Sequence, residues 1–324
     1  MSRAFVFPGQ GAQALGMGRD LAEAYPAARA VFEEVDEALG EPLSALVWGG
    51  DEAALTLTEN AQPALMATSM AAMRALEAEG VGVEAAAFVA GHSLGEYSAL
   101  AAARALSLSD AARLLRLRGR AMQAAVPVGE GAMAALLGVD LAKAQAIAEA
   151  AAGGEVLQVA NDNDPAQVVL SGTRAAVERA VALAAEQGAK RAVRLPVSAP
   201  FHCALMEPAA QAMARALAEV EIAPPAVPVV ANVRAAAVDD PELIRALLVE
   251  QVTAAVRWRE SVLWMAGQGV SEMWEIGAGR ALSGMARRIE RGLSARTVGT
   301  AEEVRLAAAA ATATASAPAS GGAA

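Results

Sequence analysis

The sequence predicts an α/β protein in which a mostly parallel sheet carries helices on both faces and a ferredoxin-like module is inserted. Short apolar stretches typical of strands alternate with longer helical patterns, which favours a parallel sheet. Residues 131–197 break this rhythm with the order βαββαβ, which is the order of a ferredoxin-like module. The 324 residues are 55% hydrophobic but only 3% aromatic, because much of the apolar content is alanine, a strong helix former.

The first third of the chain shows the alternation of strands and helices. The stretch "AFVF" near the N-terminus is short and apolar, as expected for a buried strand, and "AAAFVAG" is a second one. Helical patterns separate and follow these two strands: around 17–25, 27–39 and 60–79, from about 96, and two more near 109–125.

The inserted module has four strand-like stretches, "GAMAALLGV", "EVLQVAN", "QVVLSG" and "AKRAVRLPV", with helical patterns after the first and third. Helix-rich sequence then resumes, with strands expected at "PVVAN", "EMWEIG" and "RTVG". We therefore predict a discontinuous larger domain, 1–127 and 198–306, and a module at 128–197. The remainder, 307–324, is alanine mixed with Thr, Ser, Pro and Gly and is predicted to be a disordered tail.

Composition excludes several classes of protein. A net charge of −10 argues against a general nucleic-acid binder, which needs a dominant basic surface. Cys203 is the only cysteine, so no intrachain disulfide and no cysteine-only metal site can form, and we predict no metal. The N-terminus lacks a secretory pattern, and no apolar run reaches the roughly 18–20 residues of a membrane span. We expect a cytoplasmic protein.

The stretch "GHSLG" places Ser93 between two glycines, after a strand and before a helix. This is the nucleophile-elbow pattern, in which a strained turn projects the hydroxyl from the sheet edge. The following helix offers the Leu94 amide to a developing oxyanion. The alternative is a tight turn with an incidental serine.

The general base must come from one of only two histidines if an imidazole activates Ser93. His92 is adjacent in sequence, and neighbouring residues that leave a strand point to opposite sides, so we expect it to support the turn. His202 lies in the proline-bracketed loop "PVSAPFHCALMEP" and is the favoured base. No acidic third member is apparent, and a main-chain carbonyl can orient an imidazole instead.

One arginine of "DAARLLRLRGRAMQ" differs from its neighbours. On a helix, Arg113, Arg116 and Arg120 share one face and are predicted to be solvated. Arg118 falls within the apolar stripe. A guanidinium there either forms a structural ion pair or binds a substrate carboxylate through two oxygens.

The glycine-rich stretch "FPGQGAQALGMG" fits neither a dinucleotide fingerprint nor a P-loop. Its predicted chemical use is to supply a second amide, near Gln10, which with Leu94 would form an oxyanion hole. A plain strand-end turn is the alternative.

Several of these stretches, taken together, resemble the malonyl-CoA:acyl carrier protein transacylases. The resemblance is carried by "FPGQGAQ", "NAQPAL", "GHSLGEYSAL", "LRGRAMQ", "NDNDPAQVVLSG", "PVSAPFHCALM" and "VEQVTAAVRW". These are collinear with the family and cover nearly all of the chain except the tail. The resemblance implies a hydrolase-like α/β domain with a ferredoxin-like subdomain.

The resemblance also implies roles for individual residues. Ser93 would carry the acyl group as an ester, with His202 as base, Arg118 on the malonyl carboxylate, and the Gln10 and Leu94 amides as oxyanion hole. It adds four further positions: a main-chain carbonyl of Gln251 to hold the histidine, a Phe201 that favours malonyl over branched acyl groups, and Gln62 and Asn161 lining the site.

The implied reaction is ping-pong transfer from malonyl-CoA to the phosphopantetheine thiol of acyl carrier protein, for fatty acid synthesis, with no bound cofactor and with a monomeric enzyme. Carrier proteins of this family are acidic, so a local basic patch is expected on this acidic chain. Two sets of basic residues are available, with ordinary solvated charge as the alternative: Lys190, Arg191 and Arg194, or Arg287, Arg288 and Arg291. Other readings are a different dicarboxylic acyl donor, polyketide synthesis, a serine esterase or thioesterase, and a non-catalytic acyl-binding protein.

Overall fold

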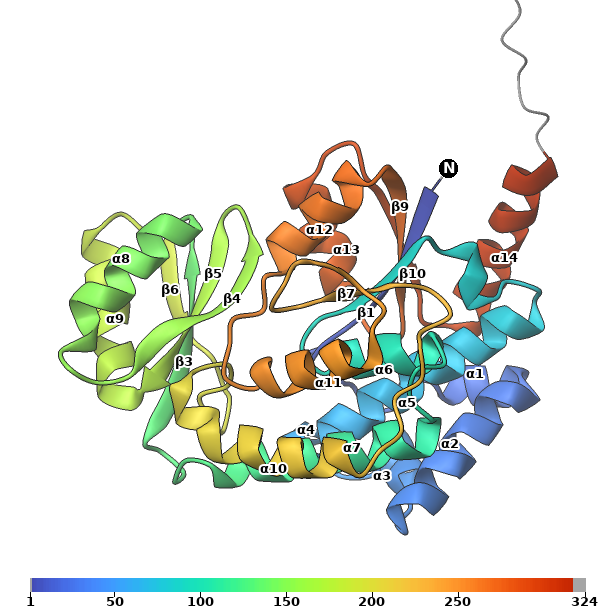
Figure 1. The fold of residues 1–324 in the computed structure, drawn as a ribbon, viewed down its shortest axis with the longest axis horizontal. Coiled ribbons are helices and arrows are strands. Elements are labelled where there is room, and N and C mark those ends of the chain that lie inside the picture. The colour runs from blue at the N-terminus through green and yellow to red at the C-terminus, as the bar shows by residue number, and fades with distance from the viewer. Residues whose placement is uncertain (1, 317–324) are drawn as a thin grey trace, which may run out of the picture.

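A six-stranded sheet forms the centre of the larger part of the protein (Figure 1). The computed structural model describes residues 2–316. The sheet order is β10-β9-β1-β2-β7-β8, and every neighbouring pair is parallel except the β7–β8 hairpin. Its strands are β1 (Ser2–Phe7), β2 (Phe88–Gly91), β7 (Val229–Ala231), β8 (Ala236–Val238), β9 (Val270–Ile276) and β10 (Ser294–Val298).

Helices cover both faces of this sheet, as predicted. Alternate side chains of β1 enter two separate cores: Phe5 and Phe7 pack with the larger helical layer, whereas Ala4 and Val6 pack with α12 and α13. The helices and 3₁₀ turns of this part are α1 (Arg19–Ala24), α2 (Pro26–Leu39), α3 (Leu43–Gly49), α4 (Glu52–Thr56), α5 (Thr58–Ala78), η1 (Val83–Ala85), α6 (Gly95–Ala102), α7 (Leu108–Ala124), η2 (Ala204–Met206), α10 (Glu207–Ala218), α11 (Pro241–Glu250), α12 (Trp258–Gly267), α13 (Ala281–Ile289) and α14 (Ala301–Ser316). The two helical patterns expected near 109–125 are one helix, α7.

The ferredoxin-like order βαββαβ is confirmed as a second, antiparallel sheet with strand order β4-β5-β3-β6. It has a core of its own, in which small side chains of α8 and α9 pack on one face of the sheet. Figure 1 shows it at one end of the molecule, beyond α12. Its elements are β3 (Gly131–Leu137), α8 (Leu141–Ala152), β4 (Leu157–Asp164), β5 (Gln167–Thr173), α9 (Arg174–Glu186) and β6 (Arg191–Arg194).

The predicted disordered tail is wrong over residues 307–316, which continue α14. Val304, Ala307 and Ala308 are buried, and the helix packs on α5. Alanine's high helix propensity outweighs the absence of larger apolar residues once such a docking surface exists. The rest of the predicted tail, 317–324, lies outside the described residues.

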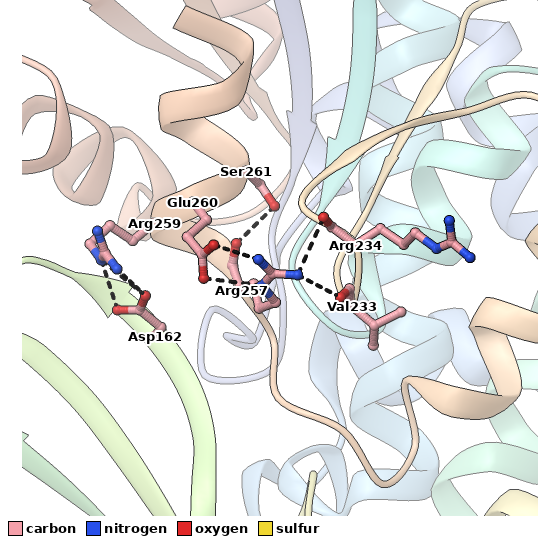
Figure 2. A network of polar contacts seen from close by, with 7 residues as sticks. All are labelled: Asp162, Val233, Arg234, Arg257, Arg259, Glu260 and Ser261. Carbon is pink, nitrogen blue, oxygen red and sulfur yellow. Dashed lines mark hydrogen bonds and ion pairs between the residues drawn. The ribbon is translucent and has the colours of Figure 1, made fainter. Parts of the chain in front are cut away.

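The two sheets are joined through strand β4. Asn161 forms a parallel bridge with Val256, and backbone bonds flank it on both sides at 3.0 Å and 2.9 Å. Figure 2 shows Arg259 of α12 reaching the buried Asp162 carboxylate, with nitrogen–oxygen distances of 2.9 to 3.1 Å. Arg288 of α13 binds the buried Asp164 in the same way, at 2.8 Å. These contacts fix the module against α12, α13 and the segment that precedes α12.

None of the helices in residues 2–316 is long and apolar enough to cross a membrane.

Candidate active site

Ser93 lies at a sharp turn between β2 and α6. Its φ is +55°, a left-handed conformation that is rare for a residue with a side chain. The flanking glycines have a packing reason. A Cβ on Gly91 would lie 1.9 Å from the backbone of Gly95, and a Cβ on Gly95 would lie 2.3 Å from the carbonyl oxygen of Phe7. Only glycine allows strand, turn and helix to approach this closely, so the pattern is a genuine elbow.

His202 and Ser93 are brought together across 109 positions of sequence. The Ser93 Oγ lies 2.7 Å from His202 Nε2. His202 Nδ1 lies 2.9 Å from the main-chain carbonyl oxygen of Gln251, so Nδ1–H donates to it and Nε2 accepts from the serine. Burial, and then the positive charge of Arg118, lower the pKa of His202 to about 3. The imidazole is therefore neutral at pH 7, in the state that accepts a proton.

His92 points to a different partner, as its position predicts. Its Nε2 lies 2.9 Å from Asn163 Oδ1 of β4, and its ring is tilted against Trp258 at 5.7 Å between centroids. Burial lowers its pKa, so it too is neutral. His92 thus ties the elbow to the second sheet.

Arg118 is buried beside the serine. Its exposed fraction is 1%, and its side chain is held by two amide oxygens: Nη1 donates to Gln62 at 2.7 Å and Nη2 donates to Gln251 at 2.8 Å. Nη2 also lies 3.1 Å from Ser93 Oγ. Within residues 2–316 no carboxylate forms an ion pair with it, and its Nε has no partner.

A buried cation without an ion pair is costly, and burial lowers the pKa of Arg118. Of the two predicted uses, the structural ion pair is absent among the described residues. Glu96 acts on its charge without forming an ion pair, and the other predicted use, the binding of an anion, stays a prediction.

The neighbouring arginines differ from the prediction at one position. Arg113 and Arg120 are exposed, as expected for a solvated face. Arg116 is 6% exposed, and it pairs with Glu41 at 2.6 Å and with the Glu59 carbonyl at 2.9 Å. Its partners come from segments far away in sequence, which helix periodicity cannot reveal.

Gln10 and Leu94 both line the same cavity, and their backbone amides donate to no other group of residues 2–316. The approach of the two loops depends on Gly9, where a Cβ would lie 2.7 Å from the His92 carbonyl oxygen. Two free amides beside an elbow serine can hydrogen-bond an oxyanion.

The cavity encloses about 430 Å³ between the two sheets. The larger domain contributes Ser93, Arg118 and Gln62, and the module contributes Asn161 and Met133. Phe201, which is 8% exposed, also lines it. Every predicted site residue is therefore at this cavity except Gln251, which lies behind Arg118 and His202 and contacts both.

Three residues of this arrangement were not predicted from the sequence. Asn232 Oδ1 accepts from the Ser93 amide at 2.8 Å, and its Nδ2 donates to the Gly91 carbonyl at 2.7 Å. Asn163 holds His92, and the buried Glu96 contacts Asn232 and Gln251. Only Glu96 had a local signal, since Ser-x-x-Glu is the capping-box spacing.

No group of three or more His, Cys, Asp or Glu residues within 2–316 is arranged to hold a metal ion. A serine at an elbow, a neutral histidine within hydrogen-bond distance of it and two amides without a partner among residues 2–316 are the groups that serine acyl transfer requires.

The chain belongs to the acyl transferase family, whose model, "Acyl transferase domain", matches residues 4–310. The malonyl CoA-acyl carrier protein transacylase of Bacillus subtilis (strain 168) is 47% identical over 305 residues, 94% of this chain and 95% of that protein. A crystal structure of acyl-carrier-protein-S-malonyltransferase from Bartonella henselae has a TM-score of 0.94 and 56% identity, covering 96% and 100% of the two chains.

A further solved structure holds a type II PKS acyl-carrier protein in complex with its malonyl-transacylase. It has a TM-score of 0.93 and 44% identity, covering 96% of this chain and 100% of that chain. Within the acyl transferase family, the place of this chain is therefore among the malonyl CoA-acyl carrier protein transacylases, and the predicted α/β fold class is confirmed.

Proposed function

We propose that this protein moves a malonyl group from malonyl-CoA to the phosphopantetheine thiol of acyl carrier protein, through an ester on Ser93. The family supports the reaction class. The observation that carries the proposal is Arg118: a buried guanidinium without an ion pair among residues 2–316, whose Nη2 lies 3.1 Å from the Ser93 hydroxyl. In the proposal it binds the free carboxylate of the acyl group attached to that serine.

In the first half-reaction, His202 Nε2 takes the Ser93 proton while Oγ attacks the thioester carbonyl. The oxyanion accepts hydrogen bonds from the Gln10 and Leu94 amides. The carbon–sulfur bond then breaks, and coenzyme A leaves as a thiol with the proton from His202. In the second half-reaction, His202 takes the proton of the phosphopantetheine thiol, sulfur attacks the ester, and Ser93 recovers its proton as the malonyl thioester departs.

The carboxylate of the substrate has a second effect. The Arg118 charge is one cause of the low pKa of His202. When malonyl binds, its carboxylate offsets that charge, which makes His202 a stronger base. Basicity is therefore highest when the correct acyl group is present.

Phe201 restricts the acyl group. Phe201 lines the cavity next to His202 in sequence, and in the proposal its ring lies beside the acyl α-carbon and restricts a branch there. A single methyl contributes roughly 1–3 kcal/mol of discrimination, so the preference for malonyl over branched donors is partial.

Acyl carrier protein is the proposed acceptor, and a neighbouring structure is a malonyl-transacylase in complex with its acyl-carrier protein. Lys190, Arg191 and Arg194 are exposed on the module, as are Arg287 and Arg291 near α13. Arg288 is less available, because it binds Asp164.

The enzyme is proposed to act as a monomer in the cytoplasm and to supply fatty acid synthesis. Coenzyme A takes part only as a component of its substrate.

Intact-mass spectrometry tests the proposal. The protein is mixed with malonyl-CoA, its mass is recorded, and holo-acyl carrier protein is then added. The expected result is one malonyl adduct, absent in Ser93→Ala, that moves to the carrier. Intact malonyl-CoA without adduct would contradict the mechanism, and steady release of malonate would support an esterase.

A further inference from the structure

Glu96 is a buried carboxylate in the first turn of α6, with an exposed fraction of 3%. It is not among the residues that line the cavity. One of its oxygens, Oε2, accepts from the Asn232 amide at 3.1 Å and from Gln251 Nε2 at 2.8 Å. Its partners are therefore two residues that each contact the Ser93 turn.

The side-chain amide of Gln251 is fully buried and fully engaged. Its Nε2 donates to the Ser93 carbonyl at 3.0 Å as well as to Glu96, and its Oε1 accepts from Arg118 Nη2 at 2.8 Å. An amide has donors on one side and an acceptor on the other, whereas a carboxylate only accepts. The contact with Glu96 thus requires that the amide nitrogen face α6.

We propose that Glu96 is a positioning residue for carboxylate recognition, because it orients the Gln251 amide so that its oxygen holds Arg118. The reversed amide would direct an NH₂ group at the guanidinium and remove one of the two oxygens that hold it. Glu96 then acts on the substrate only through Gln251 and Arg118. This inference rests on the proposed function, since it assumes that Arg118 binds the malonyl carboxylate.

The variant that tests this is Glu96→Met, which keeps most of the side-chain volume but removes the oxygen that accepts from Gln251. Gln251 Nε2 then loses one of its two acceptors, so the preference for the observed orientation of the amide falls. The readout is the ratio of single-turnover acylation rates with malonyl-CoA and acetyl-CoA, which lacks the second carboxylate. Burial raises the pKa of Glu96 to about 7, so the assay is run at pH 8, where the wild-type group is mostly ionised.

We expect Glu96→Met to lower the malonyl-to-acetyl ratio by about ten-fold or more, as for the loss of one hydrogen bond to a charged group. In an Arg118→Ala background the same substitution should change the ratio by less than about two-fold, because the guanidinium through which Glu96 acts on the substrate is absent. The matched control is Glu275→Met. Glu275 is also buried and accepts the Leu282 and Ser283 amides, but it lies outside the site, so its loss should leave the ratio unchanged.

A purely structural role predicts different results: equal losses with both donors, or the same loss in the Arg118→Ala background. Either would overturn the proposal. If Glu96→Met does not fold, Gln251→Met carries the test, because it removes the amide and keeps the main-chain carbonyl. An unchanged ratio in that variant also overturns it. Absence of any malonyl adduct on the wild-type protein would instead refute the proposed function.

Discussion

Replacing Arg118 by alanine removes the proposed carboxylate site and leaves the Ser93–His202 pair in place. The guanidinium is 1% exposed, so its contact with a substrate carboxylate is almost completely desolvated. Truncating one partner of a buried charge pair costs about 3–5 kcal/mol. That loss corresponds to a roughly 150- to 5,000-fold lower kcat/KM for malonyl-CoA.

The assay compares donors that differ only in the carboxylate. With acetyl-CoA, Arg118→Ala loses the contact of Nη2 with Ser93 Oγ and leaves the Gln62 and Gln251 oxygens without their donor. Loss of the Arg118 charge also raises the pKa of His202 and makes it a stronger base, so a net fall of less than about ten-fold is expected. Arg118→Lys keeps the charge but not the planar fork and should be intermediate with malonyl-CoA. Equal losses with both donors in Arg118→Ala would refute the reasoning, because the arginine would then support the site without recognising the carboxylate.

Three further predictions concern the elbow, the base and the junction between the sheets. Gly95→Ala places a Cβ 2.3 Å from the Phe7 carbonyl oxygen of β1 and should abolish acylation and lower Tm. Gly267→Ala, whose Cβ would have nothing within 4 Å, should change neither. Normal acylation by Gly95→Ala would contradict the close approach of strand and helix. Because the pKa of His202 is about 3, the rate of acylation by acetyl-CoA should stay nearly constant from pH 8 to 5. With a histidine of the usual pKa, the rate would fall about 30-fold by pH 5. Such a fall in stopped-flow measurements would show that His202 is not held neutral. Asp162→Asn removes the ion pair with Arg259 and should lower the free energy of unfolding, measured by urea titration, by about 1–3 kcal/mol. An unchanged unfolding midpoint would show that this ion pair does not stabilise the contact between β4 and α12.

Residue scarcity made the catalytic centre predictable from sequence. With only two histidines, and one of them on the wrong side of the elbow, His202 was the remaining base, and the structure places it 2.7 Å from the serine oxygen. The burial of Arg118 could be predicted because this charged residue interrupts an apolar helix face, a signal that depends only on local periodicity. The strand–helix alternation and the βαββαβ order were predictable for the same reason.

Features that depend on distant partners could not be predicted in this way. Arg116 has the periodicity of a solvated position, yet it is buried by Glu41, a residue 75 positions earlier. Asn232 has no local pattern that links it to Ser93, although its side chain holds the amide of that residue. Residues 307–316 have a low-complexity composition, and what makes them an ordered helix is the surface of α5 on which α14 packs. In each case the deciding contact joins segments that the chain order keeps apart.

The most direct test of the central claim is a crystal structure of the protein after brief exposure to malonyl-CoA. Continuous density is expected from Ser93 Oγ to a malonyl group, with its carboxylate within hydrogen-bond distance of both Arg118 terminal nitrogens. The carbonyl oxygen of the ester should face the amides of Gln10 and Leu94. An acyl group on any other residue would contradict the proposed ester on Ser93, and a malonyl carboxylate directed away from Arg118 would contradict the proposed role of that arginine.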